Sequence, residues 1–139
     1  MSELPLELAV TAAMTPAVHV AYLGYLKPDE VTRELGSADV LVVASRYDGW
    51  AVVVEEAMAQ GTPVIASDAV GAAADLVVDG YSGFRFSSEN SEALAVALSA
   101  VMNRDISDPP LSVGAVAIVI QHRDMYNIET LDRAIRGAP

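Results

Sequence analysis

Short apolar runs alternate along the chain with segments whose apolar residues recur at helical spacing. The clearest run is Asp39–Ala44, which is unbroken and therefore predicts a strand buried on both faces, as in a parallel sheet. Three more runs predict strands, and a fourth is assigned to a strand by its β-branched residues. These runs are Ala17–Leu23, Val64–Ala66, Gly83–Phe86 and Ala115–Ile120.

Helices are expected between these runs. Pro28, followed by two acidic residues, predicts the start of a helix that continues to about Gly36. A helix that begins near Trp50 is expected to end at Gly61, ahead of a proline. The other expected helices are Leu4–Met14, Gly71–Val78, Ser88–Met102 and Ile128–Ile135. Strands and helices in alternation predict an α/β fold, a Rossmann-like parallel sheet flanked by helices, with Asp39–Ala44 as its central strand.

The loop after Asp39–Ala44 is the first candidate site, because ligands of such sheets bind at the carboxyl ends of the strands. It leads into a helix N-terminus, whose unpaired N–H groups and positive dipole suit a diphosphate. Gly49 permits close approach of a ligand, and the carboxylates of Asp48 and Glu56 can project toward this edge. The pattern alone favours a plainer interpretation by about two to one, in which Asp48 caps the helix and Glu56 is a solvated surface residue.

The segment Ser45–Asp68 resembles the signature of retaining glycosyltransferases of family 4, which have the GT-B fold. That signature is an acidic residue, seven intervening positions and then Glu-Ala-Met-Ala-x-Gly-x-Pro-Val-Ile; Asp48 and Glu56 occupy its acidic positions. Further segments resemble family segments in the same order, namely Val20–Gly24, Gly71–Val77 and Asp79–Phe84. The resemblance covers about residues 6–102. It implies a single partial nucleotide-sugar-binding domain over residues 1–139, in which residues 103–139 form a C-terminal tail with a helix.

The resemblance implies binding of a nucleotide-diphosphate sugar, from which the sugar is transferred to an acceptor. Asp48 would be the catalytic-site residue that hydrogen-bonds hydroxyls of the donor sugar, and Glu56 would bind the ribose hydroxyls. The resemblance also implies two further sets of contacts: backbone contacts with the sugar and diphosphate, and two side chains that flank the base. These are Gly49, Trp50 and Ala51 for the backbone, and Tyr22 and Leu23 for the base. The resemblance implies no metal and no other cofactor.

Two residues depart from the family pattern. Asp48 stands where Glu is commoner, so its carboxylate reaches one methylene less far, and Ala51 stands where Gly is usual. The family's lobe also begins with a strand–helix–strand unit that carries basic residues for the diphosphate, and an acceptor-binding N-terminal lobe precedes it. We expect both to be absent from this chain, which is then inactive alone.

Composition narrows the range of partners. Eight basic and nineteen acidic residues give a net charge of −11, and Lys27 is the single lysine, so no basic face for nucleic acid or anionic lipid is expected. The absence of cysteine excludes disulfides, thiolate metal sites and cysteine nucleophiles. No apolar run approaches the roughly 18 residues of a spanning helix. A cytoplasmic protein without a membrane span is expected.

Two alternatives to a donor-binding part of an enzyme remain. One is a truncated, non-catalytic α/β module that folds and oligomerises without transferase activity; the other is an unrelated flavodoxin-like domain, which the ordered motifs disfavour. An uncovered strand edge and apolar helix faces predict a homo-oligomer. Trp50 is interpreted as either a wall of the ligand site or a structural plug, and His122 as a surface residue.

Overall fold

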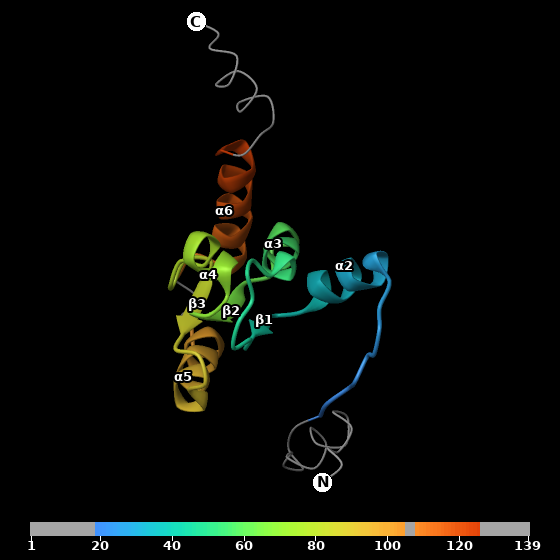
Figure 1. Cartoon of the computed structure of the whole chain (residues 1–139). Helices are drawn as coiled ribbons and strands as arrows, with labels where there is room; N and C mark the ends of the chain where they lie inside the picture. The colour runs from blue at the N-terminus through green and yellow to red at the C-terminus, as the bar shows by residue number, and fades with distance from the viewer. Residues whose placement is uncertain (1–18, 105–107, 126–139) are drawn as a thin grey trace, which may run out of the picture.

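A three-stranded parallel sheet forms the centre of the fold. The computed structural model describes residues 19–104 and 108–125 of the chain. In this part the strands are β1 (Leu41–Val43), β2 (Val64–Ser67) and β3 (Gly83–Phe86), in the order β1-β2-β3 (Figure 1). Leu41 pairs with Val64 and Val64 pairs with Gly83, so the three carboxyl ends lie at one edge. The predicted α/β class with a parallel sheet is confirmed.

Helices cover both faces of this sheet. On one face lie α3 (Val52–Ala59), α4 (Gly71–Leu76) and α6 (Leu111–Met125), and on the other lies α5 (Ser91–Met102) (Figure 1). The crossovers that parallel strands require are α3, between β1 and β2, and α4, between β2 and β3. Ahead of β1, α2 (Pro28–Ser37) packs against α3.

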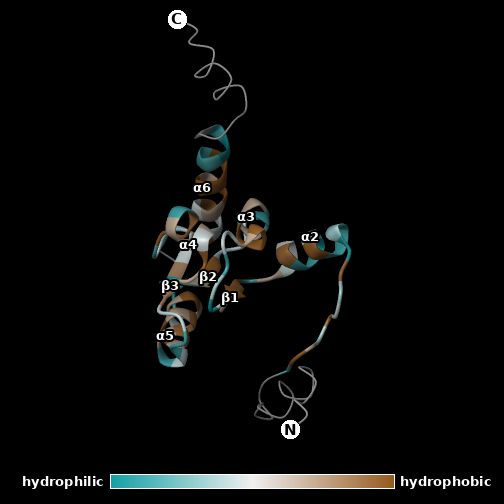
Figure 2. Cartoon of the chain, in the orientation of Figure 1, coloured by the Kyte–Doolittle hydropathy of each residue, from teal (hydrophilic) through white to brown (hydrophobic). Residues whose placement is uncertain are grey.

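Successive side chains of β2 point to opposite faces of the sheet and divide the core into two clusters. Every residue of β2 is fully buried, and Figure 2 shows β1 and β2 in the colour of apolar residues. Val64 and Ala66 belong to the cluster formed with α3, α4 and α6, whereas Ile65 packs with Phe86 and Ala97 on the side of α5. A strand covered on both faces needs a small or apolar residue at each position, which explains the unbroken run in the sequence.

Two expectations about the strands are wrong. Residues 19–23 of the expected strand Ala17–Leu23 belong to no strand and are exposed, and its first two residues lie outside the described ones. Asp39–Ala44 was expected at the centre of the sheet but contributes β1, which pairs only with β2 in the described part, while β2 holds the centre. A strand forms only where a neighbour pairs its backbone, and the segment before α2 runs away from β1 (Figure 1). Its β-branched residues do not replace that neighbour.

The C-terminal apolar run Ala115–Ile120 is helical, contrary to the expected strand. It forms the middle of α6, and its buried residues Leu111, Ala115 and Val119 recur every four positions along one helix face. That face packs on α3, and Gly114 brings the helix against the carbonyl oxygen of Tyr81, which a β-carbon at this glycine would meet at 1.9 Å. Tertiary packing of one helix face therefore overrides the strand propensity of the β-branched residues.

The remaining helix predictions are confirmed with slightly shifted ends in α2, α3, α4 and α5. The expected helices Leu4–Met14 and Ile128–Ile135 lie outside the described residues. Within the described residues, no helix has the length and apolar character needed to cross a membrane.

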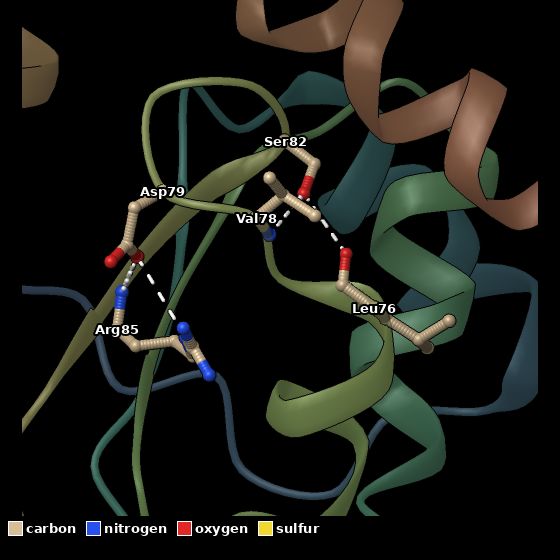
Figure 3. A network of polar contacts seen from close by, with 5 residues as sticks. All are labelled: Leu76, Val78, Asp79, Ser82 and Arg85. Carbon is tan, nitrogen blue, oxygen red and sulfur yellow. Dashed lines mark hydrogen bonds and ion pairs between the residues drawn. The ribbon is translucent and has the colours of Figure 1, made fainter.

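Polar contacts fix the turn between α4 and β3 (Figure 3). The fully buried Ser82 hydroxyl donates to the carbonyl oxygen of Leu76 and accepts from the N–H of Val78, each at 2.9 Å. The Asp79 carboxylate accepts a 2.7 Å hydrogen bond from the N–H of Arg85 and lies 3.9 Å from its guanidinium. The buried hydroxyl thus satisfies a carbonyl left unpaired at the C-terminal end of α4 and an N–H of the turn that follows.

Candidate functional site

Two loops join at the carboxyl edge of the sheet. The N–H of Asp48, in the loop after β1, donates to the carbonyl oxygen of Ala69 at 3.1 Å, in the loop after β2. In return, the N–H of Gly71 donates to the carbonyl oxygen of Asp48 at 2.9 Å, and the N–H of Ala72 donates to that of Trp50 at 2.9 Å. The parallel pairing of β1 and β2 thus continues past both strands, as an isolated bridge between Asp48 and Val70.

Close backbone contact holds these loops together. A β-carbon on Gly71 would lie 2.0 Å from the carbonyl oxygen of Gly49, so no larger residue fits without displacing the loop. At the base of the loops, the buried Ser67 hydroxyl donates to the carbonyl oxygen of Ser45 at 2.6 Å. Sequence reasoning assigned no role to Gly71 or Ser67, because both contacts join positions that are distant in the chain.

The Asp48 carboxylate is half-buried and oriented by its own loop. Its Oδ1 accepts a 3.0 Å hydrogen bond from the N–H of Trp50, two residues along. This contact is an Asx-type turn, and the residue at the N-cap of α3 is Ala51, so Asp48 does not cap the helix. Oδ2 of Asp48 has no hydrogen-bond partner within residues 19–104 and 108–125, which leaves it available to a ligand hydroxyl.

Ala51 has an unusual backbone conformation at the start of α3. Its φ of 63° and ψ of 75° lie in the left-handed region, and its side chain is buried. A β-carbon makes this region unfavourable, whereas glycine adopts it without penalty. Ala51 is the position at which glycine was expected from the family pattern, and the need for glycine there is conformational.

Glu55 and Glu56 lie on different sides of α3. The Glu55 carboxylate contacts Nε of Arg123, on α6, at 3.4 Å. Glu56 is in the helix, as expected, and is exposed together with Val52 and Gln60 on the same face. Within the described residues its carboxylate has no hydrogen bond or ion pair, so Glu56 holds no part of the fold together.

Tyr22 and Leu23 are not brought to this edge. Both side chains are more than half exposed, at 58% and 53%. They belong to the segment before α2, which continues through Gly24, with a φ of +64°, and lies away from the sheet (Figure 1). The structure therefore places Asp48, Gly49, Trp50 and Ala51 in one loop, Glu56 on the following helix, and the two base-flanking candidates elsewhere.

The charge at the carboxyl edge is mixed. The Arg46 guanidinium, in the loop after β1, lies 3.0 Å from the Glu89 carboxylate, and both side chains are largely exposed. Asp68 accepts a 2.8 Å hydrogen bond from the N–H of Ser88. Among the residues the structure describes, no cluster of three His, Asp or Glu side chains is arranged to hold a metal ion.

Among the surface hollows in the described part of the structure, two lie at opposite ends of the strands. One of about 250 Å³ lies at the carboxyl edge, where Ala44 and Phe86 face the first turn of α5. A larger one, of about 540 Å³, lies at the amino edge, between Asp39, Pro63 and Arg104. Neither hollow is lined by Asp48 or Glu56.

His122 was interpreted as a surface residue, but it is half-buried and stacked on Trp50. The two ring centroids are 5.6 Å apart, with an angle of 25° between the ring planes. Trp50 itself packs at the margin of the main core cluster. The sequence did not predict this contact, because the run Ala115–Ile120 was expected to be a strand. In the structure this run is part of α6, and the helix places His122 beside Trp50.

The chain matches the family model for glycosyl transferases group 1 over residues 9–111. It is 32% identical to the lipopolysaccharide core biosynthesis mannosyltransferase LpcC of Rhizobium leguminosarum bv. viciae, over 82% of this chain and 36% of that protein. It is 34% identical to D-inositol 3-phosphate glycosyltransferase of Mycolicibacterium gilvum, over 87% of this chain and 26% of that protein.

Solved structures of glycosyltransferases resemble the fold of this chain. Sucrose-phosphate synthase from Thermosynechococcus elongatus matches with a TM-score of 0.69 at 26% identity, over 86% of this chain and 31% of that one. Anabaena HepE in complex with UDP-glucose matches with a TM-score of 0.61 at 26% identity, over 74% of this chain and 30% of that one. The fold is that of part of a GT-B glycosyltransferase, and the chain spans between 26% and 36% of these four proteins.

Proposed function

Because the chain belongs to the glycosyl transferases group 1 family, we propose that it is the donor-binding part of a retaining glycosyltransferase. The observation that carries the proposal is the loop from Asp48 to Ala51, which the neighbouring loop holds at the carboxyl edge of the sheet. Ligands of open parallel sheets bind at this edge. HepE was solved with UDP-glucose and LpcC is a mannosyltransferase, which supports a nucleotide-diphosphate sugar as the ligand.

Two carboxylates give the site its selectivity for sugar hydroxyls. Oδ1 of Asp48 is engaged by the N–H of Trp50, and Oδ2 accepts a hydrogen bond from a hydroxyl of the donor sugar. Glu56 accepts hydrogen bonds from both ribose hydroxyls, because a carboxylate offers two oxygens to a vicinal diol. That the Glu56 carboxylate is exposed and forms no hydrogen bond or ion pair within the described residues is consistent with a role in binding.

Backbone donors next to these carboxylates receive the diphosphate. The N–H groups of Gly49 and Ala51 have no hydrogen-bond partner among the described residues, and the first turn of α3 adds further unpaired donors. The exposed Gly49 leaves open space around its α-carbon, so a ligand can approach the main chain closely. Fixed donors of this kind stabilise the charge that develops on a departing nucleoside diphosphate.

Tyr22 and Leu23 complete the proposal as residues that flank the base. They require the segment before α2 to lie beside β1, whose second edge is unpaired in the described part. Both side chains are exposed in the described structure, and placing the segment beside β1 would bury part of their apolar surface.

The other functions of a complete transferase require more chain than this. The chain spans about a third or less of its relatives, so acceptor binding and further diphosphate contacts belong to other parts of a two-lobed enzyme. On this proposal the chain binds a donor but transfers no sugar alone. The alternative of a non-catalytic, self-associating module is supported by the exposed apolar residues Val20, Tyr25 and Val42.

Calorimetric titration of the chain with UDP, GDP, ADP and CDP tests the proposal. Saturable binding of one of them, retained in the presence of excess orthophosphate, is expected, because base and ribose contacts add to those of the phosphates. Binding that orthophosphate abolishes, or no binding of any of the four, would favour the non-catalytic module.

A further inference from the structure

The last described turn of α6 reaches the candidate site from the opposite end of the chain. Leu111, Ala115 and Val119 anchor the helix in the main core, so its direction relative to α3 is fixed by packing. His122 and Arg123 follow on the same helix and lie over the start of α3. This turn of α6 is therefore a neighbour of the site loop and not a part of it.

Two contacts join this turn to the site loop and its helix. The His122 ring stacks on Trp50 with centroids 5.6 Å apart, and the Arg123 guanidinium contacts the Glu55 carboxylate at 3.4 Å. The ion pair is well exposed on the Arg123 side and is therefore the weaker of the two. The stacking contact involves a half-buried pair of rings and has a defined geometry.

Trp50 is the residue through which a contact on α6 reaches the site. Its N–H orients the Asp48 carboxylate at 3.0 Å, and its carbonyl oxygen accepts from the N–H of Ala72 at 2.9 Å. Both bonds are made by the Trp50 main chain, and packing of the Trp50 ring restricts the movement of that main chain. Ala51, next to it, already has a left-handed φ that favours relaxation of the loop.

We propose that His122 is a positioning residue for the donor site, which keeps Trp50 stacked and so holds Asp48 in its binding orientation. The ligand-binding part of this inference rests on the proposed function; the effect on the loop does not. On this proposal His122 acts on the site through Trp50 and is not itself a catalytic residue. Loss of the stacking contact should loosen the loop by about three- to tenfold, the equilibrium factor that corresponds to an aromatic pair.

The single tryptophan makes the stacking contact measurable. In His122→Ala, the emission of Trp50 should shift to longer wavelength and its quenching by acrylamide should increase, because the exposed ring face meets water. His122→Phe should restore both values to those of the native chain, because it restores a stacking ring. Gln121→Ala, an exposed neighbour on the same helix, should change neither.

Amide hydrogen exchange of the full 139-residue chain tests the positioning effect without any ligand. His122→Ala should reduce protection at Ala72 and Gly71 by about three- to tenfold, with Ile65 in β2 unchanged as the measure of global stability. His122→Phe should restore that protection. Unchanged protection at Ala72 and Gly71 in His122→Ala, or an equal loss at Ile65, would overturn the proposal.

A parallel titration with UDP and GDP separates this inference from the proposed function. Binding by the native chain that weakens about three- to tenfold in His122→Ala and recovers in His122→Phe supports both. Equal affinity of the native chain and His122→Ala overturns the positioning role and leaves donor binding intact. A native chain that binds neither nucleotide counts against the proposed function, and the exchange measurement then decides on His122.

Discussion

A β-carbon added to Gly71 would lie 2.0 Å from the carbonyl oxygen of Gly49. This close approach allows the N–H of Gly71 to reach the carbonyl oxygen of Asp48 at 2.9 Å. The loops after β1 and β2 therefore form one hydrogen-bonded unit at the carboxyl edge of the sheet. The conformation of the proposed donor loop depends on a glycine that lies outside it.

Gly71→Ala should destabilise the fold by about 1–3 kcal/mol, because the added methyl group must displace the backbone of the neighbouring loop. Chemical denaturation measures the difference. Gly49→Ala is the matched control, since a β-carbon there meets no atom within 4 Å and its φ is not positive. Equal stability of Gly71→Ala and the native chain would show that the loops do not approach as described.

Ala51→Gly should stabilise the chain by about 0.5–1 kcal/mol. Removing the β-carbon relieves a left-handed φ of 63°, which is worth about 1–2 kcal/mol. Glycine loses more backbone entropy on folding than alanine does, and this loss offsets part of the gain. Thermal unfolding measures the shift. The same substitution at Ala95, exposed in the middle of α5, should instead cost about 1 kcal/mol. Destabilisation by both substitutions would contradict the backbone conformation of Ala51.

Much of the fold can be predicted from the sequence where local signals agree with packing. Proline and acidic residues mark the start of α2, and a glycine followed by a proline marks the end of α3. The apolar run at Val64–Ala66 predicts β2, because a strand covered on both faces needs that pattern. The loop that carries Asp48 and Gly49 was also predicted at the correct edge, because strand direction in a parallel sheet fixes it.

Other features depend on contacts that a local pattern cannot show. Ala115–Ile120 has strand propensity, yet α6 forms because one helix face packs on α3. The segment at residues 19–23 has strand composition but no partner beside it in the described structure. The stacking of Trp50 and His122 joins residues that only the folded chain brings together. Tertiary packing therefore decided each of these three cases.

Ser82→Ala should destabilise the chain by about 1–3 kcal/mol, because it leaves the carbonyl oxygen of Leu76 and the N–H of Val78 without their buried partner. Thermal unfolding provides the measurement. Ser99→Ala, at an exposed position of α5, is the control and should change stability by no more than about 0.5 kcal/mol. An equally small effect of both substitutions would contradict the network in Figure 3.

The chain should associate in solution through the edge of β1 that has no neighbouring strand in the described structure. Light scattering is expected to give a mass above the 14.6 kDa of one chain, because exposed strand edges and apolar residues favour pairing. Val42→Lys on β1 should reduce the mass by placing a charge on that edge, whereas Val96→Lys on α5 should not. A native mass of one chain that does not grow with concentration would refute self-association.

The proposed donor site is tested most directly by the effect of Glu56→Ala on nucleoside diphosphate affinity, measured by calorimetry. Glu56 is exposed and forms no hydrogen bond or ion pair within the described residues, so the substitution should leave the unfolding temperature unchanged. A hydrogen bond to a charged group is worth about 1.5–3 kcal/mol, so binding should weaken by about tenfold or more. Glu92→Ala, an exposed acidic residue of α5, is the control and should bind as the native chain does. Native affinity in Glu56→Ala, or equal losses in both variants, would contradict donor binding at this edge of the sheet.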